Sequence, residues 1–127
     1  MSTTEMSLSE IKTQQTVPED VYDDGYLRVE HANYYAACDG QILRLPRTEF
    51  LILSRLVRTP ERIVKSEELW GAAWGHKPLN TESLHVYIYR LRNKLSPHKL
   101  QIETMVNVGY RLSLKNSSEG REKLAAD

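Results

Sequence analysis

Cysteine is almost absent from the sequence. Cys38 is the only cysteine in 127 residues, which excludes a disulfide within the chain and agrees with a reducing compartment. A cysteine of this kind ordinarily serves as a small buried hydrophobic residue, so we assign it no function.

Long hydrophobic runs are absent too. The apolar run "FLIL" at residues 50–53 is far shorter than the roughly 20 residues that a membrane-spanning helix needs. The N-terminus, "MSTTEMSLSEIKTQQ", has no basic segment followed by an apolar core, so it does not read as a secretory signal. The sequence therefore predicts a cytoplasmic protein that does not act at a membrane.

An excess of charge of either sign is also lacking, since 17 basic side chains balance 17 acidic ones. The balance conceals a gradient along the chain. Residues 1–40 carry 2 basic and 8 acidic side chains, whereas residues 80–115 carry 6 basic and 2 acidic ones. The basic C-terminal part favours an anionic partner, although so small an excess is also compatible with a solvated surface.

Polar ends flank the part of the chain that can fold. Residues 1–22 and residues 116–127 ("NSSEGREKLAAD") are rich in polar side chains, so we expect two flexible tails. The segment 23–115 between them has the length of one small domain.

Local patterns divide this domain into elements. Clusters of β-favouring residues broken by "HAN" and "DG" within 25–45 predict short antiparallel strands joined by tight turns. The apolar spacing in "RTEFLILSRLVR" predicts a helix over 47–58 that ends before Thr59-Pro60. A second, short helix is predicted over 66–74, because acidic residues stand at the start of this segment and Gly75 follows its end.

The stretch "SLHVYIYRLRNKL" at 83–95 alternates as a strand does, yet its apolar residues have helical spacing. Leu84, Ile88, Leu91 and Leu95 fall at i, i+4, i+7 and i+11, which predicts a helix over 81–95 capped by Asn80 or Thr81. The other side of this helix carries Ser83, Val86, Tyr87, Tyr89, Arg90 and Asn93, with Arg92 and Lys94 beside them.

A hairpin is expected after this helix. The segment "QIETMVNVGYRLSL" has two β-rich halves around Asn107 and Gly109, and both residues tolerate the positive φ of a tight turn.

Four segments in this order carry a specific resemblance: "LPRTEFLIL", "EELWGAAWG", "HVYIYRLRNKL" and "IETMVNVGYRL". Over about residues 25–114 the chain resembles the OmpR/PhoB-type DNA-binding domain of bacterial response regulators in two-component systems. The resemblance implies an α+β fold, a winged helix-turn-helix with an N-terminal antiparallel sheet, three helices and a C-terminal β-hairpin wing. It leaves no chain for a receiver domain, and Asp23-Asp24 is better explained as a turn than as the acidic cluster of one.

The same resemblance implies a transcriptional regulator that binds double-stranded DNA, with helix 81–95 in the major groove and wing 101–114 at the minor groove. It implies base contacts from Ser83, His85 and Arg90, and contacts with the DNA backbone from Tyr87, Tyr89 and Arg92. It also implies phosphate contacts from Trp74, Thr104 and Tyr110. The expected interface is completed by Val86, Lys94, Val106 and Asn107, whereas Trp70 is expected in the core.

Three positions depart from the family pattern. Glu82, Tyr89 and Val106 stand where relatives commonly carry arginine. Each lost phosphate contact lowers affinity and its salt dependence, so we expect weak binding by one protomer and a dimer on DNA. The loop 75–80 matches the place where relatives touch RNA polymerase.

Other interpretations stay open at this point. Tyr87 and Tyr89 are compatible with half-buried packing, and Arg90 and Arg92 with solvated charges. The four histidines lack metal-ligand spacing, and the sequence shows neither a nucleophile–base pair nor a phosphate-binding loop, so we expect no metal, no cofactor and no enzyme.

Two classes of function therefore compete. The first is a sequence-specific transcription regulator, either standing alone or as a piece of a larger response regulator. The second is a winged-helix module that binds RNA polymerase or a partner regulator, with little or no DNA binding. The missing cations favour the second class, and the retained Arg90, Arg92, Lys94, Thr104 and Trp74 favour the first.

Overall fold

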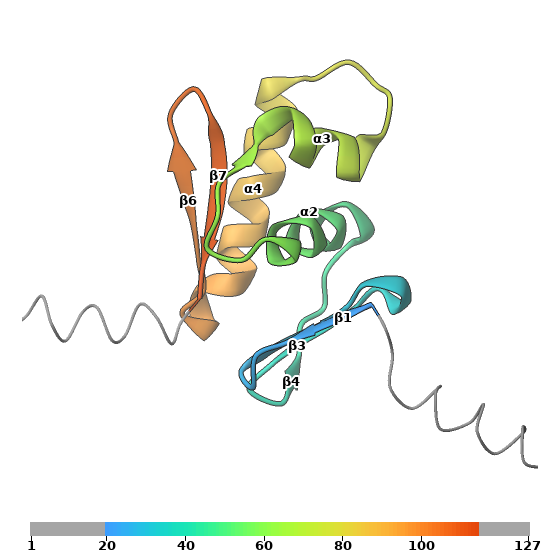
Figure 1. The fold of residues 1–127 in the computed structure, drawn as a ribbon, viewed down its shortest axis with the longest axis vertical. Coiled ribbons are helices and arrows are strands. Elements are labelled where there is room, and N and C mark those ends of the chain that lie inside the picture. Colours follow the sequence, from blue (N-terminus) through green and yellow to red (C-terminus); the bar gives the residue numbers. More distant parts are fainter. Residues whose placement is uncertain (1–19, 115–127) are drawn as a thin grey trace, which may run out of the picture.

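A computed structural model describes residues 20–114 of the chain. Four short strands come first, β1 (Val21–Asp23), β2 (Leu27–Glu30), β3 (Tyr35–Cys38) and β4 (Gln41–Ile42), with the 3-10 helix η1 (His31–Asn33) between β2 and β3. They are followed by α2 (Arg47–Arg58), β5 (Val64–Lys65), α3 (Ser66–Trp74), α4 (Thr81–Leu95), η2 (Ser96–His98), β6 (Gln101–Met105) and β7 (Gly109–Ser113). In Figure 1 the hairpin of β6 and β7, which we call the wing, lies alongside α4. The predicted α+β winged helix-turn-helix is confirmed.

The N-terminal strands form one antiparallel sheet in the order β1-β2-β3-β4. Asp39 and Gly40 both have positive φ, 52° and 81°, as the predicted tight turn requires. Strand β1 begins at Val21, inside the segment that was expected to be a tail, because Val21 and Tyr22 pair with β2. The folded part therefore starts before residue 23. The rest of both predicted tails lies outside the described residues.

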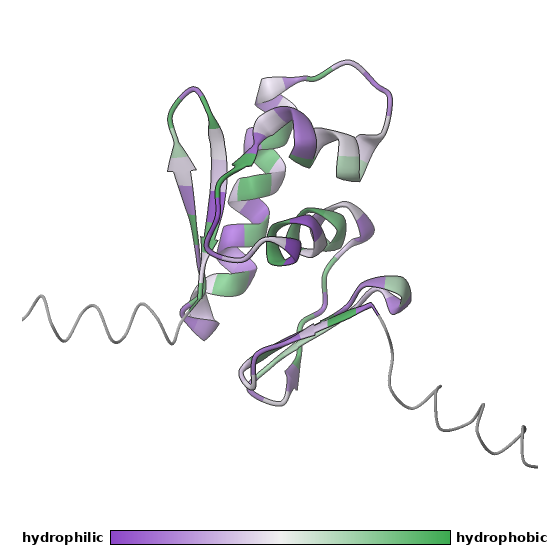
Figure 2. Ribbon diagram, in the orientation of Figure 1, coloured by the Kyte–Doolittle hydropathy of each residue, from purple (hydrophilic) through white to green (hydrophobic). Residues whose placement is uncertain are grey.

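The helices have the predicted bounds. α2 buries Phe50, Leu53, Leu56 and Val57, and it ends at Arg58, immediately before Thr59. α3 ends at Trp74, and the next residue, Gly75, has a φ of 72° that a helix cannot continue. Figure 2 shows hydrophobic and hydrophilic bands alternating along α2 and α4, as expected of helices that turn one side to a core.

The stretch that resembled a strand is helical. In α4, Leu84, Ile88, Leu91 and Leu95 are the buried residues, so the predicted apolar stripe is confirmed. Asn80 caps the helix, since its side-chain oxygen accepts a hydrogen bond from the Ser83 backbone N–H at 2.9 Å. The packed stripe fixes which side of α4 faces outward.

The wing belongs to a sheet of three strands in the order β5-β7-β6. Asn107 has a φ of 65° and makes the turn as predicted. Gly109 was expected to supply a positive φ, and this is wrong, because its φ is not positive. It is needed for close approach instead, since a Cβ there would lie 2.0 Å from the carbonyl oxygen of Val64 in β5. The strand β5 itself was not predicted.

None of the helices in residues 20–114 has the length and hydropathy of a membrane-spanning segment.

Candidate nucleic-acid interface

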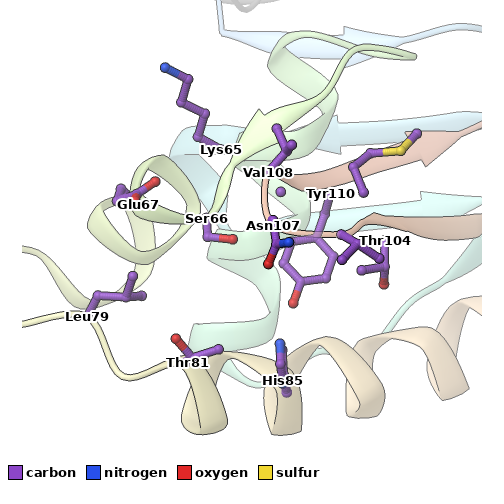
Figure 3. Close-up of a pocket in the computed structure, with 13 residues that line it drawn as sticks. Lys65, Ser66, Glu67, Leu79, Thr81, His85, Thr104, Asn107, Val108 and Tyr110 are labelled. Atoms are coloured by element: carbon purple, nitrogen blue, oxygen red, sulfur yellow. The ribbon is translucent and has the colours of Figure 1, made fainter.

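A groove runs between the start of α3, the N-terminal half of α4 and the wing. Its volume is about 630 Å³. Figure 3 shows His85 pointing into it from α4, with Tyr110 and Asn107 on the side of the wing. The groove is lined by Lys65, Ser66, Glu67, Leu79, Thr81, His85, Thr104, Met105, Val106, Asn107, Val108, Gly109 and Tyr110.

The outer side of α4 carries the residues that the sequence selected for base contact. His85 and Arg90 are exposed, Ser83 is half-buried, and Val86 is 45% exposed in spite of its apolar side chain. Tyr89 is 63% exposed, so it does not pack in the core. The side of α4 opposite the buried stripe is thus a mixed surface that carries a cation, an imidazole, a phenol and an aliphatic group.

Tyr110 and His85 join the wing to α4. Their rings meet edge to face, with centroids 6.5 Å apart. Tyr110 is only 3% exposed, and burial raises the pKa of its hydroxyl, against a smaller opposing effect of Arg92. Figure 3 shows this hydroxyl directed toward α4. Tyr110 therefore forms the floor of the groove and offers a neutral hydroxyl there.

Arg92 is engaged within the fold. Its Nε donates a hydrogen bond to the carbonyl oxygen of Ile102 at 2.9 Å, and its Nη2 donates to the hydroxyl of Thr104 at 2.6 Å. Both acceptors lie on β6. Arg92 therefore braces the wing against α4, and the Thr104 hydroxyl has a partner before any DNA arrives.

Lys94 is directed away from the groove. Its Nζ lies 2.6 Å from Oε1 of Glu49, a carboxylate in the first turn of α2 with a side chain only 3% exposed. A buried carboxylate without a partner would be costly, so Lys94 neutralises it. The contact with DNA expected of Lys94 stays a prediction, and in the structure its ammonium group is engaged with Glu49.

Four side chains stack from the core toward the outer side of α4. Trp70 and Trp74 are stacked, with ring centroids 4.0 Å apart and planes inclined by 13°. The Tyr87 ring lies 5.3 Å from Trp74, and the guanidinium carbon of Arg90 lies 4.9 Å from the centre of the Tyr87 ring. Trp70 is in the core, as predicted, and Tyr87 is half-buried, as its packing alternative predicted.

Trp74 keeps a donor for an external group. Within residues 20–114 its indole N–H makes no hydrogen bond, whereas that of Trp70 donates to the carbonyl oxygen of Lys77 at 2.6 Å. The phosphate contact implied for Trp74 thus agrees with a donor that the fold leaves unused.

The tip of the wing is apolar. Val106 is 76% exposed and Val108 is 48% exposed, on either side of the exposed Asn107. A contact from this tip with DNA would be one of shape and apolar packing rather than of charge.

Sequence reasoning missed the wall of the groove formed by β5 and the start of α3. Lys65, Ser66 and Glu67 lie there because β5 pairs with β7, and the Ser66 backbone N–H donates to the Val108 carbonyl oxygen at 3.2 Å. A strand of two residues has no periodicity, so the sequence held no signal for this wall.

Clusters of metal ligands do not occur in the described part of the chain. No group of three His, Cys, Asp or Glu side chains is placed there to hold an ion.

Comparison with known proteins places this geometry in a family. Residues 40–112 match the model of the family described as "Transcriptional regulatory protein, C terminal". The response regulator ArlR of Staphylococcus haemolyticus is 30% identical over 94 residues, which are 72% of this chain and 43% of that protein. The chain thus spans less than half the length of the curated relatives it matches.

Solved structures agree with this assignment. The DNA binding domain of CpxR from E. coli superposes with a TM-score of 0.66 at 27% identity, over 75% of this chain and 97% of that one. The RstA DNA-binding domain of Klebsiella pneumoniae, solved with the RstA box, shares the fold with a TM-score of 0.64 at 23% identity, over 75% and 98% of the two chains. The chain belongs to the family of C-terminal domains of transcriptional regulatory proteins, the OmpR/PhoB-type DNA-binding domains of response regulators.

Proposed function

We propose that this chain regulates transcription by binding double-stranded DNA sequence-specifically, with α4 in the major groove and the wing at the adjacent minor groove. The observation that carries the proposal is the outer side of α4, which presents Arg90, Val86 and Ser83 beside a groove that the wing closes. A helix fits the major groove, where each base pair has its own pattern of donors and acceptors.

Two exposed groups on α4 have a matching feature in the major groove. Arginine pairs with the two acceptors of guanine, and an aliphatic side chain packs on the methyl group of thymine. We therefore propose that Arg90 reads guanine and Val86 reads thymine, with Ser83 and His85 at neighbouring bases. Contacts with the DNA backbone are proposed for Trp74, Tyr87, Tyr89, Arg92, Thr104, Val106, Asn107 and Tyr110. Arg92 and Thr104 would make theirs while hydrogen-bonded to each other.

Selection of bound sites from a random pool of duplexes tests this function. We expect a recurring motif that contains guanine and thymine. An unenriched pool would contradict the proposal and support the second candidate function, binding of a protein partner. The observation favouring that candidate is the exposure of Tyr89 and Val106, where an apolar or aromatic group replaces a cation.

Two protomers on spaced half-sites are proposed as the bound state, because one α4 with few cations supplies little affinity. Gel-shift titration of single and paired half-sites tests this pairing. The paired site should bind more tightly and only at certain spacings, and equal affinity for both would contradict it.

Contact with RNA polymerase is proposed for the loop 75–80, whose residues are all exposed. The Trp70–Lys77 hydrogen bond holds this loop in one place. A Lys77→Ala/His76→Ala variant should keep DNA affinity and change transcription in vitro, and unchanged transcription would contradict the contact. Action on chromosomal DNA also implies a cytoplasmic, nucleoid-associated location in a bacterium.

A further inference from the structure

We infer that Tyr87 acts as a positioning residue for Arg90, through its aromatic ring rather than its hydroxyl, and so sets the sequence preference of the protein. The inference rests on the proposed function, because it concerns how Arg90 reaches a base. It is separate from the contact with the DNA backbone proposed above for Tyr87, which would use the hydroxyl and would affect all duplexes alike.

The contact between the two side chains has the geometry of a cation–π interaction. The guanidinium carbon of Arg90 lies 4.9 Å from the centre of the Tyr87 ring, inside the limit of about 6 Å for such contacts. The two residues are three positions apart on α4, and side chains of a helix lean toward its N-terminus. The stack therefore holds the guanidinium over the N-terminal half of the helix, where Ser83 and Val86 are presented.

The Tyr87 ring is itself held in place from behind. Trp74 lies 5.3 Å from it at an inclination of 47°, and Trp74 is stacked on the buried Trp70 at 4.0 Å. Trp70 is fixed by its hydrogen bond to the Lys77 carbonyl oxygen. The guanidinium thus rests on an aromatic stack that continues into the core.

A second observation makes the ring important for Arg90. In the part of the chain that the structure describes, no carboxylate forms an ion pair with Arg90. An exposed arginine with several rotatable bonds loses conformational freedom when it docks on a base. Stacking on Tyr87 restricts the side chain beforehand and leaves its N–H groups at the edge of the guanidinium available to a base.

The test separates the ring from the hydroxyl. Tyr87→Phe keeps the ring, and Tyr87→Leu removes it, while both lack the hydroxyl. The readout is the ratio of dissociation constants for the duplex selected by the wild-type protein and for the same duplex with the contacted guanine changed to adenine. That guanine is the one at which Arg90→Lys loses discrimination.

We expect Tyr87→Phe to keep the wild-type ratio and Tyr87→Leu to lower it about two- to fivefold, the range that a cation–π contact at an exposed site supplies. In an Arg90→Lys background the two Tyr87 variants should differ less. An equal ratio for Tyr87→Phe and Tyr87→Leu would overturn the inference.

A series of fluorinated phenylalanines at position 87 repeats the test without changing the shape of the ring, so it also applies if Tyr87→Leu does not fold. Fluorine withdraws charge from the ring face, so the ratio should fall stepwise with one, two and three fluorines. A flat series would overturn the inference. Failure of the proposed function is a distinct result, because the wild-type protein would then prefer no duplex at all.

Discussion

Val86 is an aliphatic side chain that remains 45% exposed on the outer side of α4, one helical turn before Arg90. If it packs on a thymine methyl group, deoxyuridine in place of that thymine should weaken binding of the wild-type protein. The Val86→Ala variant should bind the two duplexes equally. Fluorescence anisotropy with both duplexes and both proteins measures this, and a wild-type protein indifferent to every such replacement would contradict the assignment.

Predicting single residues from the sequence succeeded where a local pattern determines the side of a helix. The apolar stripe of α4 predicts that Val86, Tyr89 and Arg90 lie outward, and the structure has all three exposed. It does not settle what a long side chain reaches. Lys94 pairs with a carboxylate 45 positions away, and no local pattern contains that partner.

The packing of the wing against β5 depends on one glycine. A methyl group on Gly109 would lie 2.0 Å from the Val64 carbonyl oxygen and 2.8 Å from the Lys65 Cα, both backbone atoms that cannot turn aside. Gly109→Ala should therefore lower the free energy of unfolding by about 1–3 kcal/mol or more, through overpacking. Thermal or urea unfolding checks this value.

Gly71 in α3 is the matched control. A Cβ there meets nothing within 4 Å, so Gly71→Ala should be neutral or stabilise the protein by about 0.5–1 kcal/mol, since alanine favours a helix interior. Equal effects of the two variants would show that β5 does not lie against Gly109.

The apolar tip of the wing leads to a prediction about DNA binding. Val106→Arg should tighten binding and steepen the salt dependence by about 0.9 in the slope of log affinity against log salt, the value of one phosphate contact. Anisotropy titrations at several salt concentrations measure the slope. An unchanged slope and affinity would mean that the exposed Val106 does not approach DNA.

The elements themselves were predictable to different degrees. Helices α2, α3 and α4 are specified by contacts three and four residues apart, so their bounds followed from the sequence. The strand β5 and the reason for Gly109 did not follow, because each arises from pairing between segments more than 40 residues apart. The brace between Arg92 and β6 joins residues only 10 and 12 positions apart, but it crosses from a helix to a strand, so no helical or strand periodicity contains it.

Polar side chains join the N-terminal part of the fold to α2. Nδ1 of His31 and the Ser54 hydroxyl lie 2.5 Å apart in a buried contact, and Asp20 forms two hydrogen bonds of 3.0 Å with Arg58 beside it. Burial lowers the pKa of His31 below its ordinary value of 6.5. The charge of Arg58 lowers it further, and the charge of Asp20 acts in the opposite direction. The folded protein therefore holds His31 neutral to lower pH than the unfolded chain does.

Stability should consequently fall as the pH drops below about 6.5, because the unfolded chain gains the proton first. Urea unfolding between pH 7 and 5 measures this, and His31→Gln should flatten the slope in that window. Asp20 affects stability in a different pH range. The hydrogen bond from Arg58 lowers the pKa of Asp20 below 3.8, so the stabilisation from this pair is lost only in stronger acid. A wild-type slope unchanged in His31→Gln would contradict the role of His31.

Base reading by α4 through Arg90 is tested by the preference of the protein for the selected duplex over a scrambled one. Arg90→Ala should reduce this preference about 5- to 150-fold, the equivalent of roughly 1–3 kcal/mol for a bidentate base contact. Arg92→Ala is the control, because its side chain braces β6 and should weaken both duplexes alike. An Arg90→Ala protein that keeps the full wild-type preference would contradict base reading by Arg90.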